Sequence, residues 1–265
     1  MTSRNRIPHQ LEPYLRLPPE ASLIVLTSTL GCSATWLTAR FVSSLLDYTD
    51  DEGGETAVVL ASWLRDASWW KQELRRAAGT DVAKSVESKR LTIVDFLCND
   101  NGTVLDTIES TLRTAITTAK QGTRKVTLIL ENPDTLLALG QTTALTLSQV
   151  LLKLRTLVHA TAVVLSADLP LLEAASEHAE KVPTPIEAET AAFAVQQAHQ
   201  AGYVISVREL DTGAARDVSG VLRVTMGGGV YGAAEGTLAG KEMEALYLVQ
   251  RDGNVKVFER GSATF

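Results

Sequence analysis

ASLIVLTSTLGCSATWLTARFVSSLL, residues 21–46, is the stretch that decides the fold. Its first six residues, 21–26, are mostly apolar and predict a buried strand. Residues 27–35 are mostly small and predict a turn, and residues 36–46 then have the pattern of a helix. A strand, a small-residue loop and a helix in this order are the setting of a phosphate-binding loop, or P-loop. The stretch therefore predicts an α/β protein whose first strand leads into such a loop.

The residues of this loop differ from those that a P-loop needs to hold a nucleotide. A working loop has a glycine, four residues and then Gly-Lys-Ser/Thr. In the best register Ser28 and Ser33 replace the two glycines, and Ala34 replaces the lysine. Gly31 lies inside the loop and Thr35 ends it. Backbone amides at the helix N-terminus can still face an anion, but the lysine that holds the β- and γ-phosphates is missing, so we predict a degenerate P-loop.

A second nucleotide-binding feature is expected at the end of another buried strand. Residues 126–130, VTLIL, are followed by Glu131, and an apolar strand that ends in an acid has the form of a Walker B strand. A carboxylate there normally holds Mg²⁺ or orients water. Strands of parallel sheets also often end in an acid without either role. Because the loop lysine is missing, we expect no hydrolysis of nucleotide.

The first two-thirds of the chain alternates strands and helices. The further predicted strands are 56–61, 91–96, 125–130 and 160–165, and the predicted helices that separate them are 65–78, 103–120 and 141–159. Short apolar strands separated by helices imply a parallel sheet that helices cover on both faces.

The last third changes character after a loop predicted at 176–190 and a short helix that ends at Ala201. Strands are predicted at 203–210, 220–225 and 245–259. The last of them folds back at residues 252–254, DGN, because Asp-Gly between alternating residues is a strong hairpin signal. A parallel α/β core that ends in an antiparallel meander is the RecA-type arrangement. We therefore predict a single RecA-like domain over residues 1–265, with residues 1–19 as an N-terminal extension.

The composition limits the functions that are open to the chain. Its 265 residues are 45% hydrophobic and 21% charged, as in soluble globular proteins, and its net charge of −6 argues against strong binding of nucleic acid by the chain alone. The two cysteines, Cys32 and Cys98, are far apart, and neither they nor the four histidines have metal-ligand spacing. We expect no metal, no cofactor, and a reduced, intracellular protein. Residues 1–19 do not resemble a signal peptide, and no apolar run approaches the roughly 20 residues of a membrane-spanning helix.

Two other patterns have both a functional and a structural interpretation. Residues 227–232, GGGVYG, fit the G-x-G-x-x-G of dinucleotide-binding loops, but they follow a late strand and further glycines interrupt any helix after them, so we interpret them as a flexible loop. Residues 63–71 mix tryptophans with cations, as a stacking platform for single-stranded RNA does. We favour tryptophans that pack inside the chain or against a partner.

Several segments together resemble one known family. The most specific run is 215–225, ARDVSGVLRVT. The supporting segments are 199–201, HQA; 204–213, VISVRELDTG; 62–66, SWLRD; 132–138, NPDTLLA; and 252–261, DGNVKVFERG. In these segments the chain is similar to Elongator complex protein 6 of filamentous fungi, and the similarity spans nearly the whole chain.

This resemblance implies a function that the residues alone do not show. Elongator subunits four, five and six share a RecA-like fold and form a hetero-hexameric ring. The ring binds tRNA and joins the catalytic subcomplex of Elongator, which modifies the wobble uridine of tRNAs. Subunit six lacks intact Walker motifs, which agrees with Ala34 here. The resemblance therefore implies a non-catalytic ring subunit in the cytoplasm, and also in the nucleus. The fifth subunit is a RecA-like alternative, and the run 216–225 favours the sixth.

Two functions of other classes stay open. One is a divergent RecA-like ATPase that uses Glu131 and the loop amides, with a lysine or arginine from a neighbouring subunit. The other is a stand-alone nucleic-acid-binding module, and the acidic net charge argues against it.

Contacts to RNA are expected from cations in or beside the late strands, because RecA-like proteins direct loops from that region toward the ring centre. The candidates are Arg208, Arg216 and Arg223. Their alternative role is to pair with the acidic residues nearby in the sequence, which are Glu209, Asp211 and Asp217.

Overall fold

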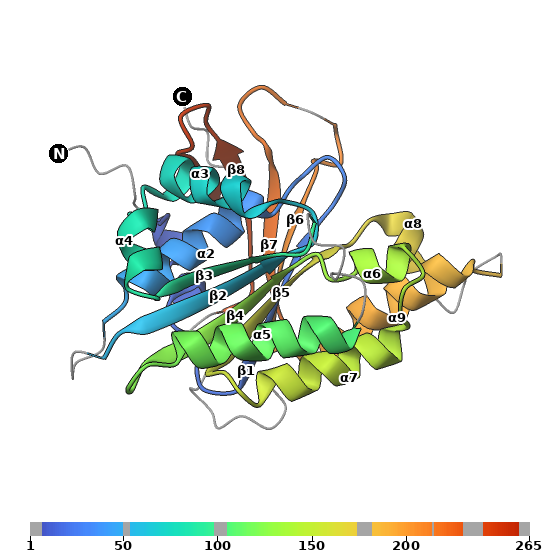
Figure 1. Cartoon of the computed structure of the whole chain (residues 1–265). Coiled ribbons are helices and arrows are strands. Elements are labelled where there is room, and N and C mark those ends of the chain that lie inside the picture. The colour runs from blue at the N-terminus through green and yellow to red at the C-terminus, as the bar shows by residue number, and fades with distance from the viewer. Residues whose placement is uncertain are drawn as a thin grey trace.

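Nine strands form one sheet in the part of the chain that the computed structural model describes, residues 7–49, 54–97, 105–173, 182–213, 215–229 and 241–259. The strands are β1 (Ser22–Ser28), β2 (Thr56–Ser62), β3 (Leu91–Asp95), β4 (Lys125–Glu131), β5 (Ala160–Ser166), β6 (Tyr203–Arg208), β7 (Gly220–Met226), β8 (Met243–Val249) and β9 (Val255–Glu259). Their order is β3-β2-β4-β5-β1-β6-β7-β8-β9. Pairs from β3 to β6 are parallel, and those from β6 to β9 are antiparallel. The predicted parallel sheet with a C-terminal meander is therefore confirmed (Figure 1).

Helices cover both faces of the parallel strands. They are the 3₁₀ helix η1 (His9–Leu11) and the α-helices α1 (Glu12–Leu15), α2 (Thr35–Asp47), α3 (Ala67–Ala78), α4 (Val82–Glu87), α5 (Leu105–Ala119), α6 (Thr135–Ala138), α7 (Ala144–Arg155), α8 (Leu169–Leu172) and α9 (Pro185–Gln200). One core cluster joins α1 to α4 to one face, and a second joins α5, α6, α7 and α9 to the other. Alternate residues of β1 serve the two clusters, Leu26 the first and Val25 the second, as the two-residue period of a strand requires. None of the described helices is long and apolar enough to cross a membrane.

Capping residues set the helix boundaries more sharply than apolar spacing does. Asp66 accepts a hydrogen bond from the Trp69 amide at 2.6 Å and starts α3. Thr184 and Glu187 form a capping box, with Pro185 as the first helical residue, a combination that fixes a helix start. The loop predicted at 176–190 is therefore wrong in its last residues, because α9 already begins at Pro185. Cys98, residues 176–181 of that predicted loop and residues 230–232 of the glycine run lie outside the described residues.

The described part of the predicted N-terminal extension, residues 7–19, contributes to the core. Leu11, Tyr14 and Leu15 are buried, with exposed fractions of 0%, 5% and 1%. The Tyr14 ring meets the Tyr203 ring edge to face, and the Tyr203 hydroxyl donates to the Tyr14 carbonyl at 2.7 Å. The segment thus packs against β6, where the parallel sheet passes into the meander.

Candidate functional site

The degenerate P-loop lies at the carboxyl end of the parallel strands, between β1 and α2. It borders a cavity of about 260 Å³. The predicted residues Ser28, Ser33, Ala34, Thr35 and Glu131 all line this cavity, so the structure brings them together. Gly31 belongs to the same loop but lines a neighbouring cavity. In α/β sheets ligands bind at this edge of the strands, which makes the cavity the candidate site.

One backbone amide at the start of α2 is engaged by a side chain of the loop itself. Ala34 is only 1% exposed and carries no charge. The Ser33 hydroxyl accepts from the Thr35 amide at 3.2 Å and lies 2.5 Å from the Thr35 hydroxyl. A helix N-terminus attracts anions through its free amides, and the first amide of α2 is already engaged by Ser33.

A carboxylate of this chain binds a backbone amide of the degenerate P-loop. The Leu30 amide at the loop tip donates to Asp168 Oδ1 at 2.8 Å. The Glu209 carboxylate lies against the loop from the other side, since a Cβ added to Gly31 would come within 1.4 Å of Glu209 Oε1. Two acidic side chains thus border a loop that has lost its lysine. Repulsion between like charges disfavours a polyphosphate there.

Glu131 is held by donors of the chain itself. Its side chain is only 2% exposed. One carboxylate oxygen pairs with Arg65, and the other accepts from the Ser62 hydroxyl and from Trp70 Nε1, the last at 3.0 Å. Both oxygens are therefore in use, as buried polar atoms normally are. This arrangement gives Glu131 a structural role at the end of β4.

The residues that follow Glu131 form hydrogen bonds between the ends of β4 and β5. Asn132 has φ of 53°, the left-handed region that asparagine tolerates better than most residues, and its side-chain amide reaches Ser166 Oγ at 3.3 Å. Asp134 accepts from the Ser166 amide at 3.0 Å. Burial raises the pKa of the Asp134 carboxyl. These polar groups form hydrogen bonds with one another, so few of their donors and acceptors are left for a ligand. Among the described residues no group of three or more His, Cys, Asp and Glu side chains is placed to hold a metal ion.

The three predicted RNA-contact arginines are placed differently. Arg208 pairs with Asp211 at 2.6 Å and reaches Glu244 at 4.0 Å. It therefore forms an ion pair with a nearby acidic residue, which was the alternative to RNA contact. Arg223 is exposed on β7, opposite Glu244. Arg216 is exposed and lines a cavity of about 550 Å³ beside the P-loop, together with Arg251.

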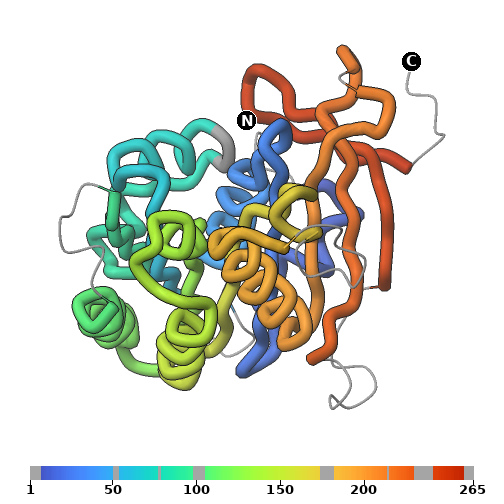
Figure 2. The backbone as a smooth tube through the Cα atoms, turned by 90° about the vertical axis from the view of Figure 1, so that its right-hand side faces the viewer, coloured from blue at the N-terminus to red at the C-terminus, as the bar shows by residue number. Residues whose placement is uncertain are grey.

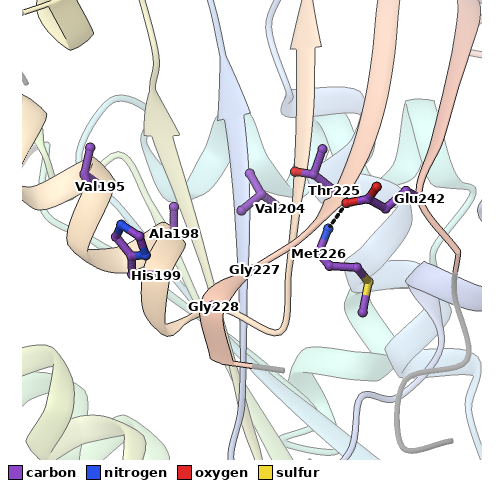
Figure 3. A pocket seen from close by; sticks show the side chains of 9 residues that line it. All are labelled: Val195, Ala198, His199, Val204, Thr225, Met226, Gly227, Gly228 and Glu242. Atoms are coloured by element: carbon purple, nitrogen blue, oxygen red, sulfur yellow. Dashed lines mark hydrogen bonds between the residues drawn. The ribbon is translucent and has the colours of Figure 1, made fainter. Parts of the chain in front are cut away.

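Gly227 and Gly228 line a cavity, and the close approach of two backbone segments explains why glycine stands at these positions without a bound dinucleotide. This cavity of about 600 Å³ lies between α9 and the β6–β7 strands. Figure 3 shows its lining, with His199 on one wall and Glu242 on the other. A Cβ on Gly227 or Gly228 would come within 2.2 Å or 2.4 Å of a carbonyl oxygen at the end of α9. These positions therefore need glycine because two backbones approach closely.

The tryptophans of residues 63–71 face mostly inward. Trp63 is 6% exposed and stacks on Phe96, with ring centroids 4.7 Å apart. Trp70 is fully buried. Trp69 is half-buried, and the Arg65 guanidinium lies over its ring at 4.7 Å. This segment is therefore core rather than a stacking platform.

Several residues were not predicted from the sequence, among them Arg65 and Asp168, which line the candidate site. Arg251, which lines the neighbouring cavity, was not predicted either. Arg65 and Asp168 each follow a parallel strand by two or three residues, and polar residues after such strands gather at one edge of the sheet. That signal was present in the sequence. No comparable signal marked Arg251, which follows an antiparallel strand in the meander.

Comparison with known proteins supports the fold. The chain matches no protein-family model, and no curated protein matches it either. Among solved structures it is similar to a KaiC-like protein from the hyperthermophilic archaeon Pyrococcus horikoshii, with 15% sequence identity, a TM-score of 0.56 and coverage of 91% of each chain. At this identity the likeness concerns the fold alone. The chain therefore has a RecA-like fold.

Proposed function

We propose that this chain is a non-catalytic RecA-like subunit that works by assembling with partners. The observation that carries the proposal is the hydrogen bond from the Leu30 amide to Asp168 Oδ1 at 2.8 Å. A carboxylate of the chain itself thus occupies an amide of the degenerate P-loop, and Ala34 provides no cation. Electrostatic stabilisation of the transferring phosphoryl group is most of what such enzymes supply. A RecA-like domain without it keeps the shape of a ring subunit and loses the chemistry.

The ring that we propose is that of the Elongator complex. The support is the resemblance of residues 215–225 to the sixth subunit, and this run covers the loop before β7 and most of β7 itself. The partners would then be subunits four and five and the catalytic subcomplex, in the cytoplasm and also in the nucleus. tRNA would bind to the assembled ring, because a chain of net charge −6 gives a polyanion an unfavourable field.

Co-expression with Elongator subunits four and five is expected to give a stable hetero-hexamer. tRNA binding is expected from the ring and not from the lone chain, and it should weaken steeply between two salt concentrations because phosphate contacts release counterions. An Arg216→Ala ring should bind less tightly, whereas an Arg208→Ala ring should change little because Arg208 is already paired. Native mass spectrometry and filter binding measure both. A homomeric ring, or tight binding by the lone chain, would contradict the proposal.

A divergent ATPase is the second candidate, and the cavity of about 260 Å³ at the loop favours it. We expect the isolated chain to release no phosphate from ATP. We expect Glu131→Gln to lower the free energy of unfolding by about 1–2 kcal/mol, because the charge-assisted bond to Arg65 is lost while Arg65, 25% exposed, can still reach water. If Glu131 instead held Mg²⁺, Glu131→Gln would abolish turnover and leave the free energy of unfolding unchanged. Turnover that vanishes in Glu131→Gln, with unchanged urea unfolding, would support the ATPase.

A further inference from the structure

α9 lies on the side of the molecule that faces the viewer in Figure 2. Exposed apolar side chains are found on this helix and on the elements that pack against it. Four of them are Leu139 after α6, Leu145 in α7, Leu169 in α8 and Ile186 in α9, with exposed fractions of 62%, 63%, 68% and 40%. α6, α7 and α8 all pack against α9, and the Ala144 amide donates to the Glu189 carboxylate at 2.5 Å. We name these four residues the α8–α9 face. Soluble monomers rarely expose large contiguous apolar patches, and such patches mark interaction sites.

The described surroundings of the α8–α9 face are acidic. α6, α8, α9 and residues 144–152 of α7 contain no lysine or arginine. The carboxylates beside the face are those of Asp168, Glu173, Glu187 and Glu189. Asp168 also binds the Leu30 amide, and the Leu30 side chain is 95% exposed at the tip of the degenerate P-loop. The apolar surface therefore extends from α8 toward the candidate site.

The side of the molecule that carries α3 and α4 has more exposed cations than exposed carboxylates. These helices lie far from α9 in Figure 1. Their surface and the turns beside them expose Lys71, Arg75, Arg76, Lys84 and Lys89 together with Asp81 and Glu87. Subunits of one fold that associate head to tail join two different surfaces. This chain thus shows, on its own opposite side, the chemistry that would complement an acidic face.

We propose that the α8–α9 face binds the basic face of a neighbouring RecA-like subunit, with exposed apolar side chains of that subunit packed against Leu145 and Leu169. The inference rests on the proposed function, which supplies the neighbour. Apolar contact at the centre gives affinity, and the surrounding carboxylates select a basic partner and repel acidic ones.

Assembly with Elongator subunits four and five tests this surface. Leu169→Asp and Glu173→Lys are each expected to weaken assembly about tenfold or more. Both residues are exposed, so circular dichroism should show an unchanged fold. The effect of Glu173→Lys should shrink in high salt, because salt screens exposed charges. The matched controls are Leu152→Asp, beside Lys153 and Arg155, and Asp106→Lys on α5, and both should assemble as the unchanged chain does.

Two kinds of failure can be told apart. If the unchanged chain does not assemble with subunits four and five, the proposed function fails and the inference fails with it. If the ring forms and Leu169→Asp and Glu173→Lys assemble at full strength, only the inference is overturned. A photo-crosslinker placed at residue 145 of the assembled ring gives a second readout. Crosslinks to a segment rich in lysine or arginine support the inference, and their absence in an intact ring overturns it.

Discussion

Trp70→Ala is expected to lower the free energy of unfolding by about 3–5 kcal/mol, the usual cost of removing a fully buried aromatic side chain. Trp70 has no exposed surface and packs in the core cluster that joins α3 to the sheet. Its Nε1 also donates to Glu131, so the variant leaves a buried carboxylate with one donor fewer. Both losses act in the folded state of the chain alone.

The matched comparison is Trp69→Ala. Trp69 is half-buried, meets Trp70 edge to face at 5.3 Å and carries Arg65 over its ring. We expect a loss of about 1–2 kcal/mol from this contact and the partial burial. Urea unfolding followed by circular dichroism measures both variants, with an unchanged m-value as the sign of a true stability change. If Trp70→Ala kept its stability and lost only assembly with partners, Trp70 would be an interface residue after all.

Much of the fold follows from short-range patterns. The strand–loop–helix stretch from β1 to α2, the parallel strands and the β8–β9 hairpin were each predicted from local apolar periodicity or turn chemistry, and the sheet order confirms how they combine. The start of α9 was missed although Thr184, Pro185 and Glu187 carry the signal of a capping box. Leu11, Tyr14 and Leu15 likewise have the i, i+3, i+4 spacing of a buried helical face.

The sequence shows which nucleotide-binding residues the candidate site lacks, but it does not show which residues of the chain contact the loop and Glu131 instead. The missing lysine is visible at Ala34. The carboxylate that binds the loop belongs to Asp168, which is 138 positions from Leu30 in the chain. Spacing predicts that residues after parallel strands share one edge of the sheet, but it does not say which side chain turns toward which amide. The three partners of Glu131 are hidden for the same reason, since they come from β2, the turn after it and α3.

Removing residues 1–19 is expected to abolish cooperative unfolding of the chain. Leu11 and Leu15 are 0% and 1% exposed, and truncating a buried leucine alone costs about 2–5 kcal/mol. Loss of both, and of Tyr14 with its contact to Tyr203, amounts to about 5 kcal/mol or more, which is comparable to the whole stability of a typical domain. Differential scanning calorimetry of the truncated chain should show no sharp transition.

Graded variants keep this prediction testable if the truncated chain cannot be purified. Leu11→Ala and Leu15→Ala should each lower the urea midpoint in proportion to a loss of about 2–4 kcal/mol. Glu12→Ala is the matched control in the same segment, because the Glu12–Arg16 pair is exposed and 3.8 Å long, and such pairs contribute less than about 1 kcal/mol. A truncated chain that unfolds at the midpoint of the full chain would show that residues 1–19 are a dispensable extension. The burial of Leu11, Tyr14 and Leu15 predicts instead that the sheet needs this segment where it changes from parallel to antiparallel pairing.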